Sequence, residues 1–452
     1  MKKKYVRWTL WTIASPFILF IILCILIYLP PIQNFLVDKA AVYASEATGM
    51  NISVGRISLS FPLNLVVTNV DAASPHNDTL LSVRRLQVNV QLLPLLKKQV
   101  EVDGISLQGA TVNSNDLIHG MRLNGTLGEL FISSHGVALD PETAIVNKVL
   151  LKDTDLSLCL NDTAAADTAA SDTAYWKIIL QDIDLQNVSF ALDMPLDSLS
   201  LAASLDNATL RDGLIDLHKS AYSLQTFRIK NGRVRYDSGR PSATASADSL
   251  SAGLDPSHIA LTDIGVKLDS LYYEGRNMKA IISQFVLKER SGVEIVSTEG
   301  RLVSNDKVLR VPSLKLETRD SYLELNAAMD WDALDFKKEG LVSARLMADI
   351  GKPDVVRFMG SMDEKFIRKY PSEPLRIRTG IDGDLNKLKL TTLTAELPGA
   401  LELFAKGELT SLTDSLLRGG DITLQAETKD LKFISTLAEG IEIPYGTRLE
   451  GK

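Results

Sequence analysis

Residues 85–92 read RLQVNVQL, and this stretch decides the fold class. Leu86, Val88, Val90 and Leu92 take alternate positions, and polar side chains fill the positions between them. Strict alternation over a short run is typical of a β-strand with one apolar face and one face in water. Antiparallel sheets show this pattern, whereas parallel sheets that are covered on both faces do not.

The same alternation returns along most of the chain. It occurs at Ile105/Leu107, Ile183/Leu185, Leu314/Leu316, Leu323/Leu325, Ile377/Ile381, Leu388/Leu390, Leu401/Leu403 and Ile422/Leu424. We therefore predict a mainly β protein, with an elongated, repetitive antiparallel sheet and a few short helices.

An irregular repeat accompanies the alternation, with the form apolar-x-apolar-x-Gly/Asn/Asp-x-x-apolar. Its copies are Ile105-x-Leu107-x-Gly109 with Val112, Val149-x-Leu151-x-Asp153 with Leu156, Ile183-x-Leu185-x-Asn187 with Phe190, and Phe227-x-Ile229-x-Asn231 with Val234. The spacing of roughly 35–45 residues is typical of stacked arrays. Gly, Asn and Asp tolerate left-handed backbone angles, so we expect a turn at this position and a pair of strands in each copy.

The N-terminus carries an apolar run from Trp8 to Leu29 without a charged residue. Its length suits a hydrocarbon core of roughly 30 Å. Residues 1–7 hold four cations, which favour a cytoplasmic tail by the positive-inside rule. A cleaved signal peptide is the alternative, but it would have a shorter apolar core and a small-residue cleavage site. We therefore expect residues 8–29 to anchor the chain in a membrane as a single pass, with the N-terminus in the cytoplasm.

Two helices are expected outside this anchor. Residues 32–49 show helical spacing of apolar side chains and end at Gly49, a good helix-terminating residue. Residues 353–370 are the second candidate, with Asp354 in the first turn and Val355, Val356, Phe358 and Met359 on an apolar face. We expect residues 50–452 to form an exported β-repeat body. The pattern runs to Lys452 without a terminal cap, and we expect the natural chain to continue.

Composition argues against several functions. The chain has 452 residues and a net charge of −7, which disfavours nucleic acid as a partner. Its two cysteines are Cys24, which lies within the predicted anchor, and Cys159, which lies far away in the body, so they exclude a disulfide scaffold or a cysteine zinc site. Motifs for acyl transfer, phosphate binding and dinucleotide binding are absent from the sequence. We expect no enzyme activity, no cofactor and no metal.

A short motif of Asp, then Ser or Thr, then an apolar residue recurs along the body. It is similar to the acceptor motif of Bacteroidetes periplasmic O-glycosylation, while ordinary turn chemistry is the alternative reading. The candidate acceptors are Thr79, Thr163, Thr168, Thr173, Ser198, Ser249, Ser270 and Ser415.

The order of motifs at the start of the body resembles the AsmA/TamB family. After the anchor and a helix ending Ala47-Thr48-Gly49 come Val54-Gly55-Arg56-Ile57, Phe61-Pro62-Leu63, Leu65 to Val70, Leu86 to Val90, Pro94-Leu95-Leu96, and Val100 to Ala110. The sequence looks most like the N-terminal part of a Bacteroidetes TamB. The resemblance implies an inner-membrane anchor and a periplasmic sheet curled into a taco-shaped groove with an apolar lining.

The resemblance also implies a role in cell-envelope biogenesis. The first reading is phospholipid transfer between the inner and outer membranes. The alternatives are assembly or translocation of outer-membrane proteins with an Omp85-type partner, and a structural scaffold that transports nothing. Candidate groove-lining residues are Leu86, Val88, Val90, Leu92, Ile105, Leu107, Ile183, Leu185, Phe227, Ile229, Leu323, Leu325, Leu401 and Leu403.

Simple energetics fit lipid transfer. A phospholipid has about 30 methylenes, and each costs roughly 0.8 kcal/mol to expose to water. An apolar trough would remove most of a barrier on the order of 20 kcal/mol and needs no catalytic residue. About 25 stacked strands would extend on the order of 120 Å. The sequence leaves open whether the apolar face lines a groove or fills a packed core.

Overall fold

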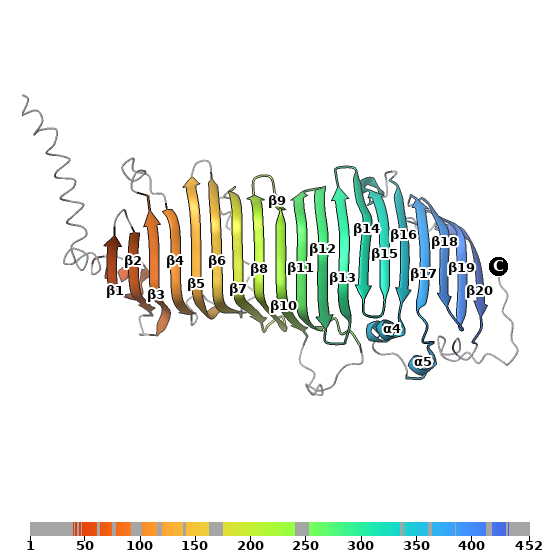
Figure 1. Cartoon of the computed structure of the whole chain (residues 1–452), viewed down its shortest axis with the longest axis horizontal. Coiled ribbons are helices and arrows are strands. Elements are labelled where there is room, and N and C mark those ends of the chain that lie inside the picture. Colours follow the sequence, from red (N-terminus) through yellow and green to blue (C-terminus); the bar gives the residue numbers. More distant parts are fainter. Residues whose placement is uncertain are drawn as a thin grey trace, which may run out of the picture. The chain divides into compact units, whose positions relative to one another are not determined.

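The computed structural model of this chain describes residues 39, 41–42, 45–46, 48–60, 64–74, 78–91, 102–114, 120–138, 142–161, 175–239, 253–334, 338, 340–359, 364–384, 386–412, 418–430 and 433. Its described part is mainly β, as predicted (Figure 1). The chain divides into unit 1, Met1–Thr173 with Ile178–Leu196, and unit 2, Ala174–Lys177 with Asp197–Lys452.

Unit 1 carries seven of the described strands. They are β1 (Asn51–Ser60), β2 (Asn64–Ala73), β3 (Thr79–Val90), β4 (Val102–Asn113), β5 (Met121–Ala138), β6 (Thr143–Leu160) and β7 (Lys177–Met194). From β1 to β6, each strand pairs antiparallel with the next one in the sequence. Side-chain hydrogen bonds place β7 beside β6, for example from Asn147 Nδ2 to Gln181 Oε1 at 2.9 Å.

The strands of unit 2 also pair antiparallel, and their lengths vary. They are β8 (Leu199–Asp216), β9 (Ala221–Leu224), β10 (Thr226–Ser238), β11 (His258–Glu274), β12 (Asn277–Glu289), β13 (Glu294–Ser304), β14 (Val308–Thr318), β15 (Tyr322–Asp330), β16 (Val342–Ile350), β17 (Leu375–Gly383), β18 (Lys387–Leu397), β19 (Leu401–Thr410) and β20 (Gly419–Thr428). β9 and β10 follow one another in the space between β8 and β11.

Three short helices interrupt the strands of unit 2. The 3₁₀-helix η1 (Trp331–Leu334) follows β15, while α4 (Lys352–Met359) and α5 (Glu364–Lys369) lie between β16 and β17. Figure 1 shows α4 and α5 at the lower ends of the strands. The single helix expected over residues 353–370 is thus two helices. Phe358 was expected on its packed face, but this side chain is 55% exposed.

The repeat position expected at turns has a different place in the fold. Gly109, Asp153, Asn187 and Asn231 all have left-handed backbone angles, with φ of 61°, 51°, 51° and 53°. The left-handed conformation was therefore predicted correctly. However, all four residues lie inside strands and not at hairpin turns. The prediction of a turn at this position was wrong.

The residues before β1 are described only in part. Helical backbone occurs at Lys39, at residues 41–42 and 45–46, and at Thr48. Gly49 then has φ of 70°, and its amide donates to the carbonyl of Ser45 at 2.9 Å. The anchor expected over residues 8–29 lies outside the described residues. Among the residues described, no helix combines the length and the apolar character needed to cross a membrane.

Candidate functional site

Strand register in unit 1 lines up apolar side chains into two rows across six strands. Residues that face one another in neighbouring antiparallel strands project from the same side of a sheet. The first row is Ile57, Val67, Leu86, Leu107, Leu130 and Leu151, and the second is Leu59, Leu65, Val88, Ile105, Ile132 and Val149. No polar residue interrupts either row, so unit 1 has a continuous apolar face.

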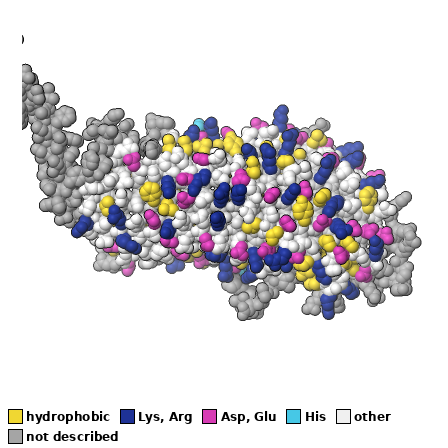
Figure 2. All heavy atoms as spheres, in the orientation of Figure 1, with side chains coloured by type: hydrophobic (Ala, Val, Ile, Leu, Met, Phe, Trp, Pro, Cys, Tyr) yellow, Lys and Arg dark blue, Asp and Glu magenta, His cyan; other side chains and the backbone are white. Residues whose placement is uncertain are grey.

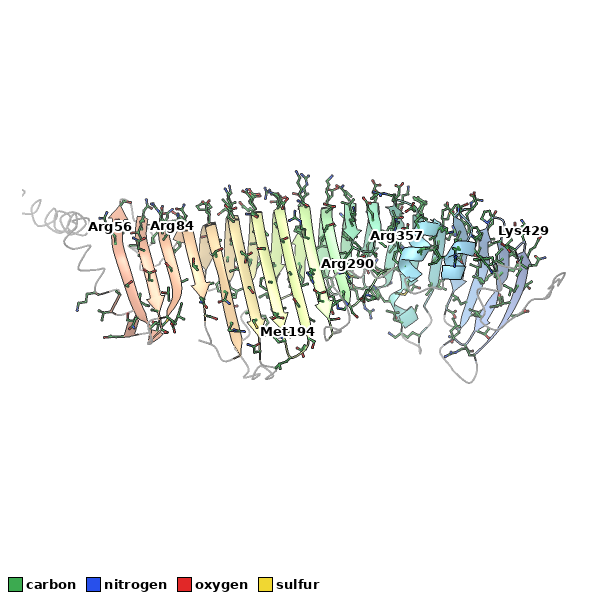
Figure 3. All side chains as sticks on the ribbon, turned by 90° about the horizontal axis from the view of Figure 1, so that it is seen from below. Arg56, Arg84, Met194, Arg290, Arg357 and Lys429 are labelled. Carbon is green, nitrogen blue, oxygen red and sulfur yellow. The ribbon has the colours of Figure 1, made fainter. Side chains whose placement is uncertain are left out.

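The opposite face of unit 1 is mixed between these two rows, where Ser58, Val66, Gln87, Ser106, Phe131 and Leu150 stand opposite one another. On the other side of the first apolar row, the same face carries a polar row of Thr68, Arg85, Gln108, Glu129 and Lys152. Both charge signs occur in it, and Figure 2 shows charged side chains of both signs scattered over the visible strands. Arg56 and Arg84, labelled in Figure 3, lie on the same side of the ribbon. The sheet is therefore amphipathic, with one wet face.

The residues with left-handed backbone angles keep the apolar side chains of a strand on the same face of the sheet. A slip of one residue in a strand moves every later side chain to the other face. In β6 the apolar positions 149 and 151 are followed by 156 and 158, so the period-two pattern slips by one residue. Asp153 stands at the slip, where Lys152 and Asp153 are both exposed and Thr154 is buried. The left-handed backbone absorbs the extra residue, as a bulge does.

The kinked residues of neighbouring strands lie in one row that runs across the strands, and glycines lie beside some of them. Asn69, with φ of 52°, lies opposite Gly55, where an added Cβ would come within 3.0 Å of the Asn69 Cβ. At Gly128 an added Cβ would stand 2.7 Å from the Cβ of Asp153. Asp153 in turn accepts a hydrogen bond of 2.9 Å from Asn187 Nδ2. Glycine provides the space that the kinked side chains need.

Unit 2 has matching rows in its later strands. One row is Leu316, Leu323, Ala348, Ile377, Ala395, Leu403 and Ala426, and the next is Leu314, Leu325, Leu346, Thr379, Leu393, Ala405 and Leu424. On the other face Arg378 Nη2 donates to Asp349 Oδ1 at 2.8 Å, and Arg376 lies 3.6 Å from Glu396. The apolar and polar faces of unit 2 are thus separated in the same way.

Burial shows that, within the part of the chain that the structure describes, no second layer packs closely over the unit 1 rows. All twelve residues of the two unit 1 rows are only half-buried. In a closed sandwich, the inner face packs against another layer and its large side chains are buried. Here the neighbouring strands supply the partial burial, and the face remains accessible.

One part of the unit 2 face is covered and provides a contrast. Phe366 and Tyr370 near α5 pack with Phe433 against Leu397 and Ala400 at the β18–β19 hairpin. Leu397 is 3% exposed, Phe366 5% and Phe433 2%. The aromatic rings meet at centroid distances of 5.6 to 5.7 Å. Covering this face therefore produces an ordinary hydrophobic core.

A buried carboxylate fixes α4 beside the strands. Asp354 is fully buried and accepts hydrogen bonds from Ser321 Oγ at 2.6 Å, Thr318 Oγ1, and Arg357 Nη1 at 2.9 Å. Burial on its own raises the pKa of Asp354. The hydrogen bonds and the Arg357 charge outweigh it, so the pKa lies below its usual value of 3.8. Arg357 also pairs with Asp320 at 2.7 Å. We assign this network to structure.

The predicted lining residues occupy several places in the fold. Leu86, Val88, Ile105 and Leu107 lie together in the unit 1 rows, and Leu323, Leu325 and Leu403 lie in the unit 2 rows. Leu401 stands opposite Leu397 at the covered end, and Phe227 and Ile229 stand opposite Leu268 and Val266. Val90 faces Val102, Ile183 and Leu185 are half-buried in β7, and Leu92 lies outside the described residues.

Several row residues were not predicted from the sequence. Leu130 and Ile132 alternate with Phe131, and Leu65 and Val67 alternate with Val66. In both stretches an apolar residue fills the intermediate position, so the period-two signal disappears. Strand register, which the sequence does not show, is what places them in the rows.

The candidate glycosylation sites are spread over different environments. Thr79 is exposed at the start of β3, Ser198 has a left-handed backbone with φ of 50°, and Ser270 is half-buried inside β11 opposite Ile281. Thr163, Thr168, Thr173, Ser249 and Ser415 lie outside the described residues. Glycosylation at these positions stays a prediction.

Comparison with known proteins does not identify a family for this chain. No model of a protein family matches the chain, and no curated protein matches it. Among the described residues, no group of three or more His, Cys, Asp or Glu side chains is arranged to hold a metal ion. The amphipathic sheet with its accessible apolar face is the feature on which a function can be argued.

Proposed function

We propose that the apolar face of the β-body carries the acyl chains of phospholipids between the two membranes of a bacterial envelope. The observation behind this proposal is the pair of uninterrupted, half-buried apolar rows in unit 1. An accessible apolar surface of this kind is unfavourable in water unless something covers it. Acyl chains are suitable guests because they need apolar contact but no fixed polar partner.

The composition of the rows fits a sliding guest. Leu, Ile and Val fill both unit 1 rows, with no aromatic ring to trap one chain position. Each methylene placed against them saves roughly 0.8 kcal/mol of exposure to water. Because neighbouring row positions are chemically alike, a chain can move along the rows without a large change in free energy.

Photocrosslinking tests this proposal. A benzophenone amino acid at Leu107 should form adducts with phospholipid in membranes that contain the protein. Gln108 is the matched control, since it is adjacent in β4 and belongs to the polar row. Adducts at position 107 and none at 108 support the proposal. Equal adducts at both positions, or none at 107, contradict it.

The alternative function, assembly of outer-membrane proteins with an Omp85-type partner, has one observation in its favour. β20 pairs with β19, and nearly all of its residues are exposed, including Ile422 and Leu424 at 44% and 45%. An exposed strand can accept another strand by β-augmentation. Crosslinkers at Asp421 or Thr423 that capture an outer-membrane protein, with no lipid adduct at Leu107, would favour this alternative.

A further inference from the structure

A group of aromatic side chains lies at one edge of the apolar face of unit 2. Tyr222 of β9 and Tyr273 of β11 stand directly opposite each other, with ring centroids 6.1 Å apart and planes tilted by 30°. Both are large side chains with substantial exposure, 40% and 43%. They lie at the strand ends opposite those that carry α4 and α5 (Figure 1).

Register places these tyrosines on the apolar face and not on the polar one. Tyr273 stands opposite Met278, which shares its side of β12 with Ala280 and Ile282. From Ile282 the row continues through Gly300, Leu314 and Leu325. The tyrosines are therefore the outermost members of the apolar face, where it meets water.

A tryptophan and an arginine complete this edge. The Nε1 group of Trp331 donates to Ser304 Oγ at 3.1 Å, and Ser304 stands opposite Met278. The guanidinium carbon of Arg276 lies 5.6 Å from the centroid of the Trp331 ring. Arg276 sits in the β11–β12 hairpin, three residues after Tyr273. We call Tyr222, Tyr273, Arg276 and Trp331 the lip.

The charge of Arg276 has no anionic partner in the lip. Its only hydrogen bond among the described residues goes from Nη1 to the backbone carbonyl of Asp306 at 3.4 Å, and it forms no ion pair there. The Asp306 carboxylate accepts from Asn277 Nδ2, and the Glu274 carboxylate accepts from Tyr272. An exposed guanidinium held over an aromatic ring presents free donors to a phosphate.

We infer that the lip binds the phosphate of a phosphate-bearing amphiphile whose acyl chains lie on the apolar face of unit 2. Arg276 donates to the phosphate, and the rings of Tyr222, Tyr273 and Trp331 contact the boundary between head group and acyl chain. Tyr and Trp suit such boundaries because an apolar ring carries a polar tip. This inference rests on the proposed function, and it adds a fixed position for the head group.

The test uses the full chain and two photoreactive phospholipids, one labelled in the head group and one at the acyl terminus. The head-group probe should label the peptide containing Tyr273 and Arg276, and Arg276→Gln should reduce this labelling about tenfold, the effect of losing one charge-assisted hydrogen bond. Tyr222→Ala should reduce it less. The control Arg228→Gln, on the polar face of β10 between Phe227 and Ile229, should change nothing.

Four outcomes would contradict the lip, and the first two also tell its failure from failure of the proposed function. Acyl labelling of β14 to β16 that persists while head-group labelling is unaffected by Arg276→Gln overturns the lip and leaves the proposed function standing. Absence of acyl labelling on any apolar row overturns both. Protection of the lip by inorganic phosphate as strong as that by phospholipid, or equal labelling of the lip by a photoreactive diacylglycerol that lacks phosphate, also overturns the inference.

Discussion

The apolar rows of unit 1 and the β17–β19 end of unit 2 have the same chemistry and different surroundings. In unit 1 every row residue is half-buried, whereas Leu397 at the β18–β19 hairpin is 3% exposed under Phe366 and Phe433. The difference comes from what covers the strands and not from the strands themselves. Where this face is covered it forms a core; where it is uncovered we propose that it binds acyl chains. The contrast within one chain makes the proposed function testable.

The largest effect should come from removing the cover. We expect Phe366→Ala to lower the free energy of unfolding by about 4 kcal/mol, because it leaves a cavity among Tyr370, Leu397 and Phe433. Urea denaturation followed by tryptophan fluorescence measures this in a Trp8→Phe, Trp11→Phe background, since the two remaining tryptophans, Trp176 and Trp331, belong to unit 2. Phe358→Ala in α4 is the matched control. Its ring is 55% exposed, so the change should stay within about 0.5 kcal/mol.

Removal of Asp354, the buried carboxylate that holds α4 beside the strands, should have the next largest effect on stability. Asp354→Ala leaves the hydroxyls of Thr318 and Ser321 and the Arg357 charge without their acceptor, and we expect a loss of about 3 kcal/mol. Asp237→Ala, which removes an exposed ion pair with Arg235, should cost less than about 1 kcal/mol. Equal losses for the two variants would contradict the role given to Asp354.

The same carboxylate predicts how stability depends on pH. The pKa of Asp354 in the folded chain lies below its usual value of 3.8. Ionised Asp354 therefore stabilises the fold fully above the unfolded-state pKa, and this contribution disappears as pH falls through the folded-state pKa. Urea midpoints measured from pH 6 down to pH 2 should fall more steeply below about pH 4 for the wild type than for Asp354→Ala. Parallel curves would contradict this.

The kinked residues of unit 1 should show a smaller effect. Asp153→Val places a β-branched residue at φ of 51°, and we expect a cost of about 1 to 2 kcal/mol. Asp153→Gly should be close to neutral, since glycine adopts this conformation freely. Unfolding followed by circular dichroism compares the two. A valine variant as stable as the glycine variant would show that the kink is not required.

The smallest effect should come from an uncovered row. Leu107→Gln is expected to cost less than about 1 kcal/mol, because the new amide remains in contact with water. Leu397→Gln, beneath the aromatic cluster, should cost about 3 kcal/mol through an unpaired buried amide and lost packing. Circular dichroism for the first variant and tryptophan fluorescence for the second provide the two values. A large cost at position 107 would mean that unit 1 has a packed core.

Strands were the feature that the sequence predicted best, because a strand leaves a local pattern of alternating side chains. Alternation at residues 85–92 and in the later stretches predicted the strand class, because side chains in a strand alternate with a fixed period. The Gly, Asn and Asp positions also predicted left-handed backbone. Their place within strands was missed, because a left-handed residue serves a turn and a mid-strand kink equally well. The slip in apolar phase after Asp153 is the signal that distinguishes them.

Features that depend on long-range contact were not predicted from the sequence. Phe358 belongs to an apolar run, yet the packing of α4 turns it to solvent while Asp354 is buried. The lip joins Tyr222, Tyr273 and Trp331 from three strand ends, and their separation along the sequence gives no sign of it. The pairing register of several hairpins brings such residues together, and the sequence of a single strand does not reveal that register.

Cysteine accessibility in a variant lacking Cys24 and Cys159 tests the central claim most directly. Leu107→Cys in unit 1 and Leu397→Cys in unit 2 are treated with an uncharged, lipophilic maleimide under native conditions, with and without phospholipid vesicles. We predict rapid labelling at position 107 that phospholipid suppresses, and no labelling at position 397 under either condition. Protection at position 107 equal to that at position 397 in the absence of lipid would contradict an open apolar face.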